Sequence, residues 1–449
     1  MAMTMKDKKE ILALNAFALE SADLSTFEDN LAELLRRREQ IFGSLSVLFY
    51  QRPLHIVSAR GCSILAADGT RYLDFYNNVP SVGHCHPRVT KAVCDQIQRL
   101  NINTRYLYRI LNDYAEKLLS LFPPELSNLV LTCTGSESND LALRIVRYFT
   151  KGEGFIVSSN AYHGNTAAVT EVSPASYRQG SLPRYVRTVP PPDPLYYGSD
   201  VGKGFAEAVA AEIQDLQQAG IPFAGLLVDT IFSSDGVYVD PPGFLQAAVD
   251  VVHEAGGLWI ADEVQPGFGR TGTMWGFERH GVVPDLVTLG KAMGNGFPMA
   301  GIVTRPEYLR AFSEHFGYFN TFAGNPVAAA AGLAVLEVIE EEGLVENASW
   351  LGTKLRSWIQ DLSTHYPVIG GVRGAGLYLG IDIVDPKDGR PDVRRATRII
   401  NALCEEKQIL IGATGSLGHI LKIRPPLCLQ SPEAELFAEA LEDVCRALL

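Results

Sequence analysis

The sequence predicts an α/β fold, with a large domain built on a mostly parallel, helix-flanked sheet and a smaller α+β domain at the C-terminus. Between about residues 87 and 336, short apolar runs alternate with stretches of helical periodicity, which is the pattern of a parallel sheet covered by helices. After about residue 337 the order changes to a long helix, short strands and a closing helix. The length of 449 residues is sufficient for both units.

The individual elements follow from local patterns. The first forty residues predict two amphipathic helices, the second starting near residue 25 with a segment that resembles a capping box. Residues 64–74 predict a hairpin, because Asp68 and Gly69 form a turn signal between two apolar stretches. The apolar runs that predict strands of the large sheet are 129–132, 155–158, 225–229, 258–261, 286–289 and 300–303.

The C-terminal unit is predicted to hold strands at 377–383 and 419–423 and a last helix at 431–449. We therefore divide the chain into an N-terminal segment of helices and a hairpin (1–86), a large domain (87–336) and a small C-terminal domain (337–449).

Composition argues against several classes of function. The formal charge of −12 would repel nucleic acids and anionic membrane surfaces. No stretch has the pattern of a signal peptide or the length of a membrane span, so we expect a cytoplasmic protein. Seven cysteines without a CxxC pair predict reduced thiols rather than disulfides or structural zinc. The expected partner is a small molecule.

Two of the apolar runs end in side chains that suit one kind of chemistry. One run leads into Asp262 and the next leads through Gly290 into Lys291, and ligands of open α/β sheets bind at such strand ends. Alone, the aspartate is more often a turn residue and the lysine a surface charge. Together they match pyridoxal phosphate (PLP), because the carboxylate keeps the pyridine nitrogen protonated while a desolvated lysine forms the Schiff base.

A phosphate site is predicted where a strand passes into a helix. Gly135 and Ser136 follow the run 129–132 and would begin the helix, where free amide groups and the helix dipole bind anions. An ordinary serine cap explains this segment equally well. Tyr162 follows the run 155–158 and offers an aromatic face for a planar ring, although such a residue is more often part of the packing.

Two other patterns carry little weight. Residues 267–272 spell GxGxxG, but neither a following helix nor an acidic residue about twenty positions later supports a dinucleotide site. His84, Cys85 and His86 lie in one short loop, a spacing that rarely completes a tetrahedral metal site. We therefore expect neither dinucleotide chemistry nor a bound metal.

Several motifs resemble the signature of class III aminotransferases, which are fold-type I PLP-dependent transferases. They follow the family's order over most of the chain. The motifs are Asp-Glu-Val-Gln at 262–265, Gly-Phe-Gly-Arg-Thr-Gly at 267–272, Gly-Lys-Ala-Met-Gly-Asn-Gly at 290–296, Thr-Phe-Ala-Gly-Asn-Pro at 321–326 and Pro-Pro-Leu at 425–427.

The resemblance implies roles for these residues. Lys291, Asp262 and Tyr162 would be catalytic, with Tyr162 stacked on the cofactor ring. Gln265 would contact the phenolic oxygen of PLP, and Val264 would pack against the other face of the ring. Thr321 would reach the phosphate of the neighbouring subunit's cofactor, which implies a homodimer. The implied cofactor-binding set is Gly135, Ser136, Tyr162, Asp262, Val264, Gln265, Lys291 and Thr321.

Family resemblance leaves the reaction open. Members that process amino acids carry an arginine where this chain has Lys422, and lysine cannot form the same bidentate fork with a carboxylate. The segments 101–107, 318–321 and 421–423 resemble ethanolamine-phosphate phospho-lyases. This implies β-elimination of phosphate from a phosphoethanolamine-like amine to give an aldehyde, ammonia and phosphate, with Lys422 and Arg105 binding the substrate.

Two alternatives remain. A transaminase of the same family would act on an ω-amine or amino acid and would need a keto acid as acceptor. A non-enzymatic PLP-binding protein would form the Schiff base without turnover, which the presence of Lys291, Asp262 and Thr321 disfavours. For Lys422 and Arg105, an ordinary surface ion pair is the competing interpretation.

Overall fold

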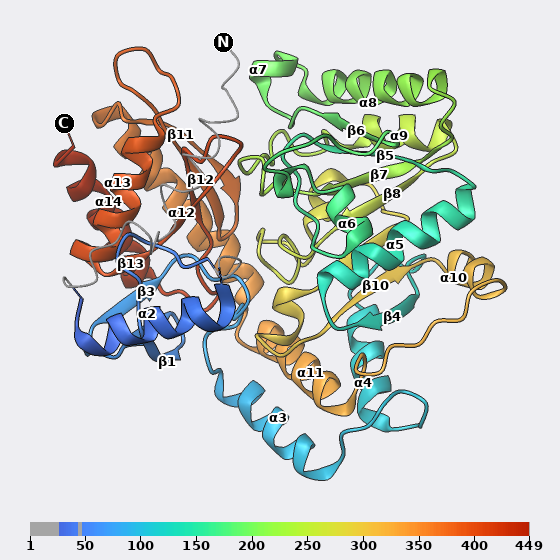
Figure 1. The fold of residues 1–449 in the computed structure, drawn as a ribbon, viewed down its shortest axis with the longest axis horizontal. Coiled ribbons are helices and arrows are strands. Elements are labelled where there is room, and N and C mark those ends of the chain that lie inside the picture. The colour runs from blue at the N-terminus through green and yellow to red at the C-terminus, as the bar shows by residue number, and fades with distance from the viewer. Residues whose placement is uncertain (1–26, 44–46, 449) are drawn as a thin grey trace.

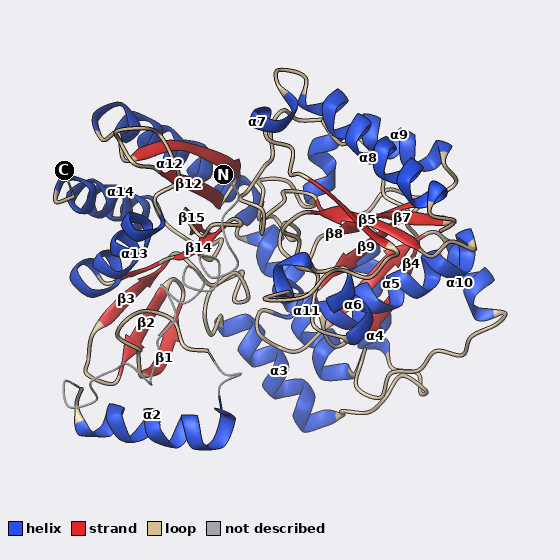
Figure 2. Ribbon diagram, turned by 45° about the horizontal axis from the view of Figure 1, so that its top comes forward, coloured by secondary structure: helices blue, strands red, loops and turns tan. Residues whose placement is uncertain are grey.

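The computed structural model describes residues 27–43 and 47–448, which fold into three β-sheets and their surrounding helices (Figure 1). One half of the molecule holds a seven-stranded sheet and the other half holds two four-stranded sheets (Figure 2). The first predicted helix lies outside the described residues. The second is α2 (Asp29–Phe42), whose N-cap, Glu28, makes no side-chain capping bond.

The large sheet is parallel apart from one strand. Its order is β4-β10-β9-β8-β7-β5-β6, and β10 runs antiparallel to both of its neighbours. The strands are β4 (Asn128–Thr132), β5 (Gly154–Ser158), β6 (Val186–Val189), β7 (Phe223–Asp229), β8 (Leu258–Asp262), β9 (Leu286–Leu289) and β10 (Ala300–Thr304).

Helices cover both faces of the large sheet, so its central strands are buried throughout. Alternate residues of β8 pack into different clusters: Trp259 lies with residues of α8 and α9, while Ile260 lies with residues of α5. Strands buried on both faces appear in the sequence as continuous apolar runs, which is why the sequence indicates them so clearly.

The helices of this half are α3 (Pro87–Arg99), α4 (Arg109–Leu119), α5 (Gly135–Thr150), α6 (Ala167–Glu171), α7 (Pro194–Tyr197), α8 (Val201–Gln218), α9 (Gln246–Glu254), α10 (Pro306–Ser313) and α11 (Pro326–Glu341).

The second half combines the two ends of the described chain. An antiparallel N-terminal hairpin shares a sheet with a strand near the C-terminus, in the order β1-β2-β3-β13, and the other sheet has the order β11-β12-β15-β14. The elements are β1 (Ile56–Arg60), β2 (Ser63–Ala66), β3 (Arg71–Asp74), α12 (Leu344–His365), β11 (Ile369–Ala375), β12 (Tyr378–Ile383), α13 (Val393–Lys407), β13 (Ile409–Leu410), β14 (Gly412–Thr414), β15 (Ile420–Ile423) and α14 (Ser431–Arg446).

The predicted fold class is confirmed: a large, mostly parallel sheet is accompanied by a smaller region of sheets and helices. The hairpin at 64–74, the six predicted strands of the large sheet and the closing helix are all present. The sequence analysis missed β6, a short strand at the sheet edge with Arg187 in its middle, and it missed α13. The division at residues 86 and 336 stays a prediction.

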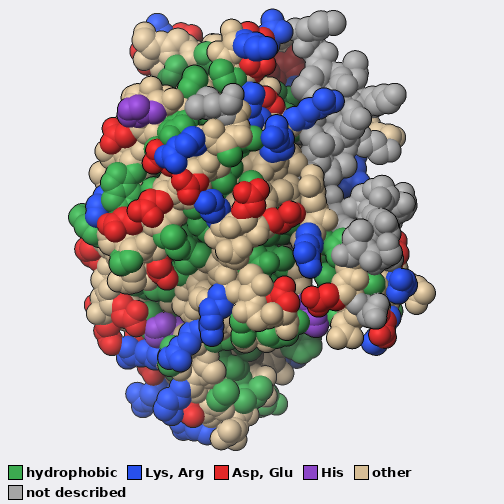
Figure 3. Space-filling view, turned by 90° about the vertical axis from the view of Figure 1, so that its left-hand side faces the viewer, with side chains coloured by type: hydrophobic (Ala, Val, Ile, Leu, Met, Phe, Trp, Pro, Cys, Tyr) green, Lys and Arg blue, Asp and Glu red, His purple; other side chains and the backbone are tan. Residues whose placement is uncertain are grey.

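The described surface is mixed in charge. On the face shown in Figure 3, acidic and basic side chains are interspersed over most of the area. Within the described residues, no helix is both long enough and apolar enough to cross a bilayer.

Candidate active site

Three adjacent strands of the large sheet carry polar residues at or next to their carboxyl ends. Asp229 at the end of β7 is paired with Asp262 at the end of β8, and Asp262 is paired with Thr288 of β9. Because these strands are parallel, their carboxyl ends lie together, where α/β sheets bind their ligands. Lys291 follows two residues after the end of β9 and begins a short 3₁₀ turn, Lys291–Gly294.

Lys291 has a backbone φ of 39°, in the left-handed region that a side chain with a Cβ rarely adopts. Burial of its side chain lowers the pKa of its ammonium group, and Arg424 lowers the pKa further, while Asp262 and Asp229 oppose the shift. A lysine with a lowered pKa carries a larger fraction of free amine, which is the nucleophilic form.

Asp262 is held by hydrogen bonds on both oxygens. Oδ2 lies 2.7 Å from His163 Nδ1 and accepts from Asn139 Nδ2 at 3.0 Å, and Oδ1 accepts from the Val264 amide at 3.1 Å. Since an ionised carboxylate only accepts, the contact with His163 requires a proton on Nδ1. Asn139 Oδ1 in turn accepts from Thr288 Oγ1 at 2.7 Å. This network keeps the carboxylate facing the end of the sheet.

The predicted anion site lies at the first turn of α5. The helix begins at Gly135, and its cap is Thr134, which forms a capping box with Glu137. The amides of the first helical residues, Gly135 and Ser136, have no partner within the helix. The loop after β5 approaches closely: a Cβ on Gly164 would lie 2.4 Å from Ser136 Oγ, so glycine is needed there.

These groups line one small cavity of about 110 Å³. All predicted cofactor-binding residues except Thr321 border it, together with three residues that the sequence analysis did not place there. The lining is Gly135, Ser136, Tyr162, His163, Gly164, Asp229, Asp262, Val264, Gln265 and Lys291.

Gln265 connects the cavity to the second half of the molecule. Its Oε1 accepts from Arg424 Nη1 at 2.7 Å and from the Tyr378 hydroxyl at 2.9 Å, and its Nε2 donates to Ser233 Oγ at 2.6 Å. Ser233 Oγ donates to Asp229 Oδ2. Burial raises the pKa of Asp229, and the hydrogen bonds from Ser233 and the nearby amides partly offset this.

Three predicted residues do not border the cavity. Thr321 is exposed on the segment between α10 and α11. Arg105 is also exposed, and its guanidinium lies 4.1 Å above the ring of Phe319. Lys422 is buried in β15, two residues before Arg424. The single chain therefore brings together the predicted cofactor groups other than Thr321, but not the predicted substrate-binding pair.

The sequence analysis missed Asn139 and assigned His163 no specific role. A signal for Asn139 was present, because it follows Ser136 by three residues and so lies on the same helical face. His163 gave no such signal, since its contact with Asp262 depends on the loop after β5 turning back over the sheet.

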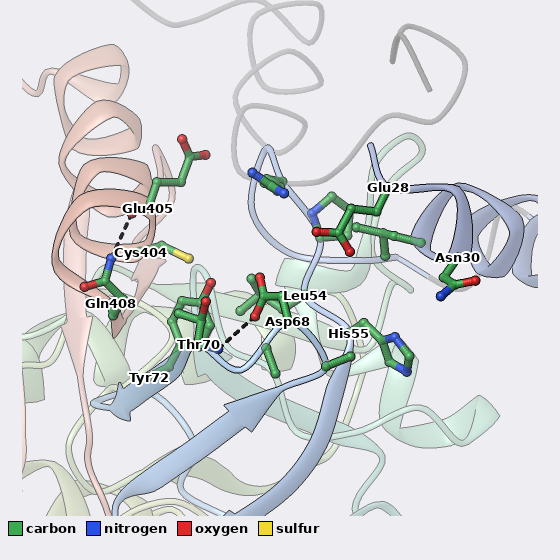
Figure 4. Close-up of a pocket in the computed structure, with 15 residues that line it drawn as sticks. Glu28, Asn30, Leu54, His55, Asp68, Thr70, Tyr72, Cys404, Glu405 and Gln408 are labelled. Carbon is green, nitrogen blue, oxygen red and sulfur yellow. Dashed lines mark hydrogen bonds between the residues drawn. The ribbon is translucent and has the colours of Figure 1, made fainter. Parts of the chain in front are cut away.

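A larger cavity of about 290 Å³ lies elsewhere, between α2, the β2–β3 turn and α13 (Figure 4). The hydrogen bonds that side chains make between its lining residues are local, from the Thr70 amide to Asp68 and from Gln408 to the Glu405 carbonyl. None of the groups around Lys291 borders it. Converging polar groups mark a functional site better than volume does, so the smaller cavity is the candidate.

The cavity fits PLP chemically. That cofactor needs an amine for its carbonyl carbon, a carboxylate for its ring nitrogen and an anion site for its phosphate. Lys291, Asp262 and the start of α5 supply these groups around one cavity.

Comparisons with known proteins agree with this chemistry. The family model described as aminotransferase class-III matches residues 49–445. A Drosophila melanogaster relative named alanine–glyoxylate aminotransferase 2-like is 38% identical, over 96% of this chain and 91% of the relative. A Caenorhabditis elegans relative named ethanolamine-phosphate phospho-lyase homolog 1 is 36% identical, over 92% of this chain and 93% of the relative.

A solved structure is also closely similar. The structure of a phospholyase from Arthrobacter in complex with phosphoethanolamine superimposes with a TM-score of 0.90 at 40% identity, covering 93% of this chain and 100% of that one. The chain thus belongs to the class III aminotransferase family, has the fold-type I architecture and is a PLP-dependent enzyme.

Proposed function

We propose that the protein is a phospho-lyase that releases phosphate from phosphoethanolamine or a similar amine. The balanced reaction is phosphoethanolamine plus water to acetaldehyde, ammonia and inorganic phosphate, so no keto acid is consumed. One observation carries the proposal: two cations, the buried Lys422 and the half-buried Arg424, lie close enough to the cavity to interact electrostatically with Lys291.

Lys422 is a buried lysine without a counter-ion. On β15 it is paired with Gly380 of β12 and with Gly412 of β14. Directly paired residues share a face of the sheet, so neither neighbour places a side chain beside Lys422. The lysine is 8% exposed, and within the described residues its ammonium group makes no hydrogen bond or ion pair.

The electrostatic surroundings of Lys422 match this isolation. Burial lowers the pKa of its ammonium group well below the usual value, and Arg424 and Lys291 act in the same direction, while Asp229 and Asp235 oppose them. A buried charge without a partner is costly. A phosphate dianion would supply the missing counter-charge.

Arg424 retains donors for the same anion. It follows directly after β15, two residues beyond Lys422. Nη1 donates to Gln265, and the guanidinium lies 4.5 Å above the ring of Tyr76. Nε is buried and has no hydrogen-bond partner in the described part of the chain. Lys422 and Arg424 together therefore suit a phosphate group better than a carboxylate.

The residues divide the work of the reaction. When bound, PLP stores the electron pair left when a proton is removed beside the amine nitrogen. Lys291 takes that proton, since its lowered pKa increases the fraction of the side chain that is a free amine. Asp262 stabilises positive charge at the ring nitrogen. Lys422 and Arg424 hold the phosphate and stabilise the charge that develops as it leaves.

Two relatives support this reaction. The Arthrobacter phospholyase was solved with phosphoethanolamine bound, and the Caenorhabditis elegans relative carries the name of a phospho-lyase homolog. The second candidate is transamination of an ω-amine or amino acid, which the Drosophila melanogaster relative favours through its name.

The deciding experiment supplies phosphoethanolamine without a keto acid and measures inorganic phosphate while the cofactor absorbance is recorded. A phospho-lyase releases many equivalents of phosphate per active site and returns to its starting spectrum. An aminotransferase releases none and stops after converting its cofactor to the amine form. Ethanolamine is the matched control substrate, because it lacks only the leaving group.

We also propose that the enzyme is a homodimer in which Thr321 contacts the phosphate of the neighbouring cofactor. On the segment that carries Thr321, the side chain of Phe322 is 72% exposed to solvent, and in the nearby loop before α4 Leu107 is completely exposed. Apolar surface of this kind is typical of protein interfaces. A second copy would cover it and bring Thr321 and Arg105 towards another cavity.

Sedimentation tests the dimer directly. Phe322→Asp should convert the dimer into monomer and lower PLP affinity. The control is Leu195→Asp, which changes another highly exposed apolar side chain away from this surface. A monomeric wild-type protein with full activity would contradict the proposal.

A further inference from the structure

The orientation of the Gln265 carboxamide is fixed by the groups on its two sides, Arg424 and the Ser233–Asp229 pair. Arg424 can only donate, so the atom of Gln265 that faces its Nη1 at 2.7 Å must be the carboxamide oxygen. At the other end, Asp229 accepts from Ser233 Oγ, which leaves the Ser233 oxygen as an acceptor for Gln265 Nε2. The carboxamide therefore cannot turn over without losing a partner on each side.

Tyr378 reinforces this orientation from within the small sheet. Its hydroxyl donates to Gln265 Oε1 at 2.9 Å, and the side chain is wholly buried beside Ile231, Val237 and Val239. Burial raises the pKa of Tyr378 to about 12, so the hydroxyl keeps its proton throughout the working range. Asn78 Nδ2 approaches the same oxygen at a longer distance of 3.4 Å.

From this network we propose that Tyr378 is a positioning residue that, together with Arg424, fixes the Gln265 carboxamide so that it offers an N–H group to the cofactor's phenolic oxygen. The inference rests on the proposed contact between Gln265 and PLP. Gln265 Nε2 has two hydrogens, and one of them is donated in the hydrogen bond to Ser233 Oγ. The second remains for a ligand in the cavity that Gln265 borders.

The orientation matters because the phenolic oxygen is an acceptor. If PLP were bound through Lys291, this oxygen could share a proton with the Lys291 nitrogen. A donor from Gln265 competes for the oxygen's electron density and so makes that proton easier to lose. A carboxamide turned the other way would present an oxygen to the phenolic oxygen, repel it and weaken cofactor binding.

The test follows the holoenzyme spectroscopically without substrate. The readouts are the pH midpoint of the cofactor's absorbance change and the dissociation constant of PLP. Gln265→Glu places an acceptor where the amide had a donor, so we expect a higher midpoint and PLP binding weakened about tenfold or more. Gln265→Ala should move both quantities in the same direction by less, since it removes the donor without adding an acceptor.

Tyr378→Phe then tests the positioning role. It removes one oxygen that never touches the cavity, and we expect a higher midpoint and PLP binding weakened about two- to fivefold. Tyr114→Phe is the matched control, because the Tyr114 hydroxyl is equally buried and has no hydrogen-bond partner in the described chain. It should leave both readouts unchanged.

The outcomes separate the two claims. If neither Gln265 variant moves the midpoint, Gln265 does not contact PLP and the proposed cofactor contact fails. If they move it and Tyr378→Phe does not, the positioning role alone is overturned. Should Tyr378→Phe fold poorly, Arg424→Gln and Arg424→Lys replace it. The lysine variant keeps a donor towards Gln265, so its midpoint should lie closer to that of the wild type than the midpoint of the glutamine variant. Equal midpoints in the two variants would overturn the inference.

Discussion

The edge of the large sheet and the facing strand of the small sheet differ in how far their polar groups are paired. Both oxygens of Asp262 accept hydrogen bonds, and the network continues through Asn139 to Thr288. On β15, by contrast, Lys422 has no partner within the described residues, and just after this strand Arg424 has a buried Nε without one.

This difference indicates which half of the site serves which task. Paired groups hold a fixed geometry at little cost, which suits a cofactor that stays bound through every turnover. A buried cation without a partner, such as Lys422, destabilises the empty protein, so its retention is best explained by an anion that enters and leaves. The large sheet would then determine the cofactor and the small sheet the reaction.

Removing Lys291 should cause the largest loss of turnover. Lys291→Ala deletes the group proposed to bind the cofactor covalently and to move the proton, and we expect turnover to fall by about 10⁴-fold or more. Phosphate release and the cofactor's absorbance band measure the loss. Lys91→Ala, at an exposed i,i+4 pair on α3, is the control. Retained turnover in Lys291→Ala would refute the assignment.

Asp262→Asn should have the next largest effect. The amide preserves the shape and an acceptor for the Val264 amide but removes the negative charge, so the ring nitrogen loses its counter-ion. We expect the rate to fall by about 10²- to 10³-fold with a change of about 1 kcal/mol or less in unfolding free energy. Steady-state kinetics and thermal unfolding separate the two. A rate near that of the wild type would remove Asp262 from this role.

Lys422→Met should affect the unpaired half selectively. Methionine matches the volume of lysine without its charge, so KM for phosphoethanolamine should rise about tenfold or more while PLP affinity stays the same. Inorganic phosphate should stabilise the wild type against heat but not the variant. An unchanged KM would show that phosphate binds elsewhere.

The same substitution should alter the pH dependence of stability. The pKa of Lys422 is lower in the folded protein than in the unfolded chain, where it is about 10.4. The unfolded state therefore binds more protons between the two pKa values, and the free energy of unfolding rises with pH there, by up to about 1.4 kcal/mol per unit. Chemical unfolding between about pH 7 and 9 should give a shallower slope for Lys422→Met. Equal slopes would mean that the buried lysine keeps an ordinary pKa.

Two groups at the edge of the large sheet could be predicted from the sequence, because Asp262 and Lys291 each lie at or just after the end of a strand that is buried on both faces. The runs that end at Asp262 and before Lys291 are continuous and apolar, and the parallel arrangement places their ends together. Gly135 and Ser136 carried the same kind of signal at a strand-to-helix junction. Only the cap differed, since Thr134 rather than Ser136 caps the start of the helix.

The rest depends on contacts between regions that are distant in the sequence. Nothing in the local pattern around Tyr378 indicates that its hydroxyl meets Gln265, because this contact forms only when the small sheet docks on the large one. The isolation of Lys422 likewise depends on two glycines contributed by other strands. The strand β6 was missed because a short edge strand with a central arginine has no clear apolar pattern.

The pairing of β3 with β13 has a consequence for synthesis of the chain. Leu73 is paired with Ile409, so the N-terminal hairpin leaves the ribosome long before the strand that completes its sheet. During translation its open edge has to remain free of other strands until nearly the whole chain has emerged. Premature termination near the C-terminus would leave that edge exposed permanently, and we expect such fragments to aggregate rather than to persist as partly active enzyme.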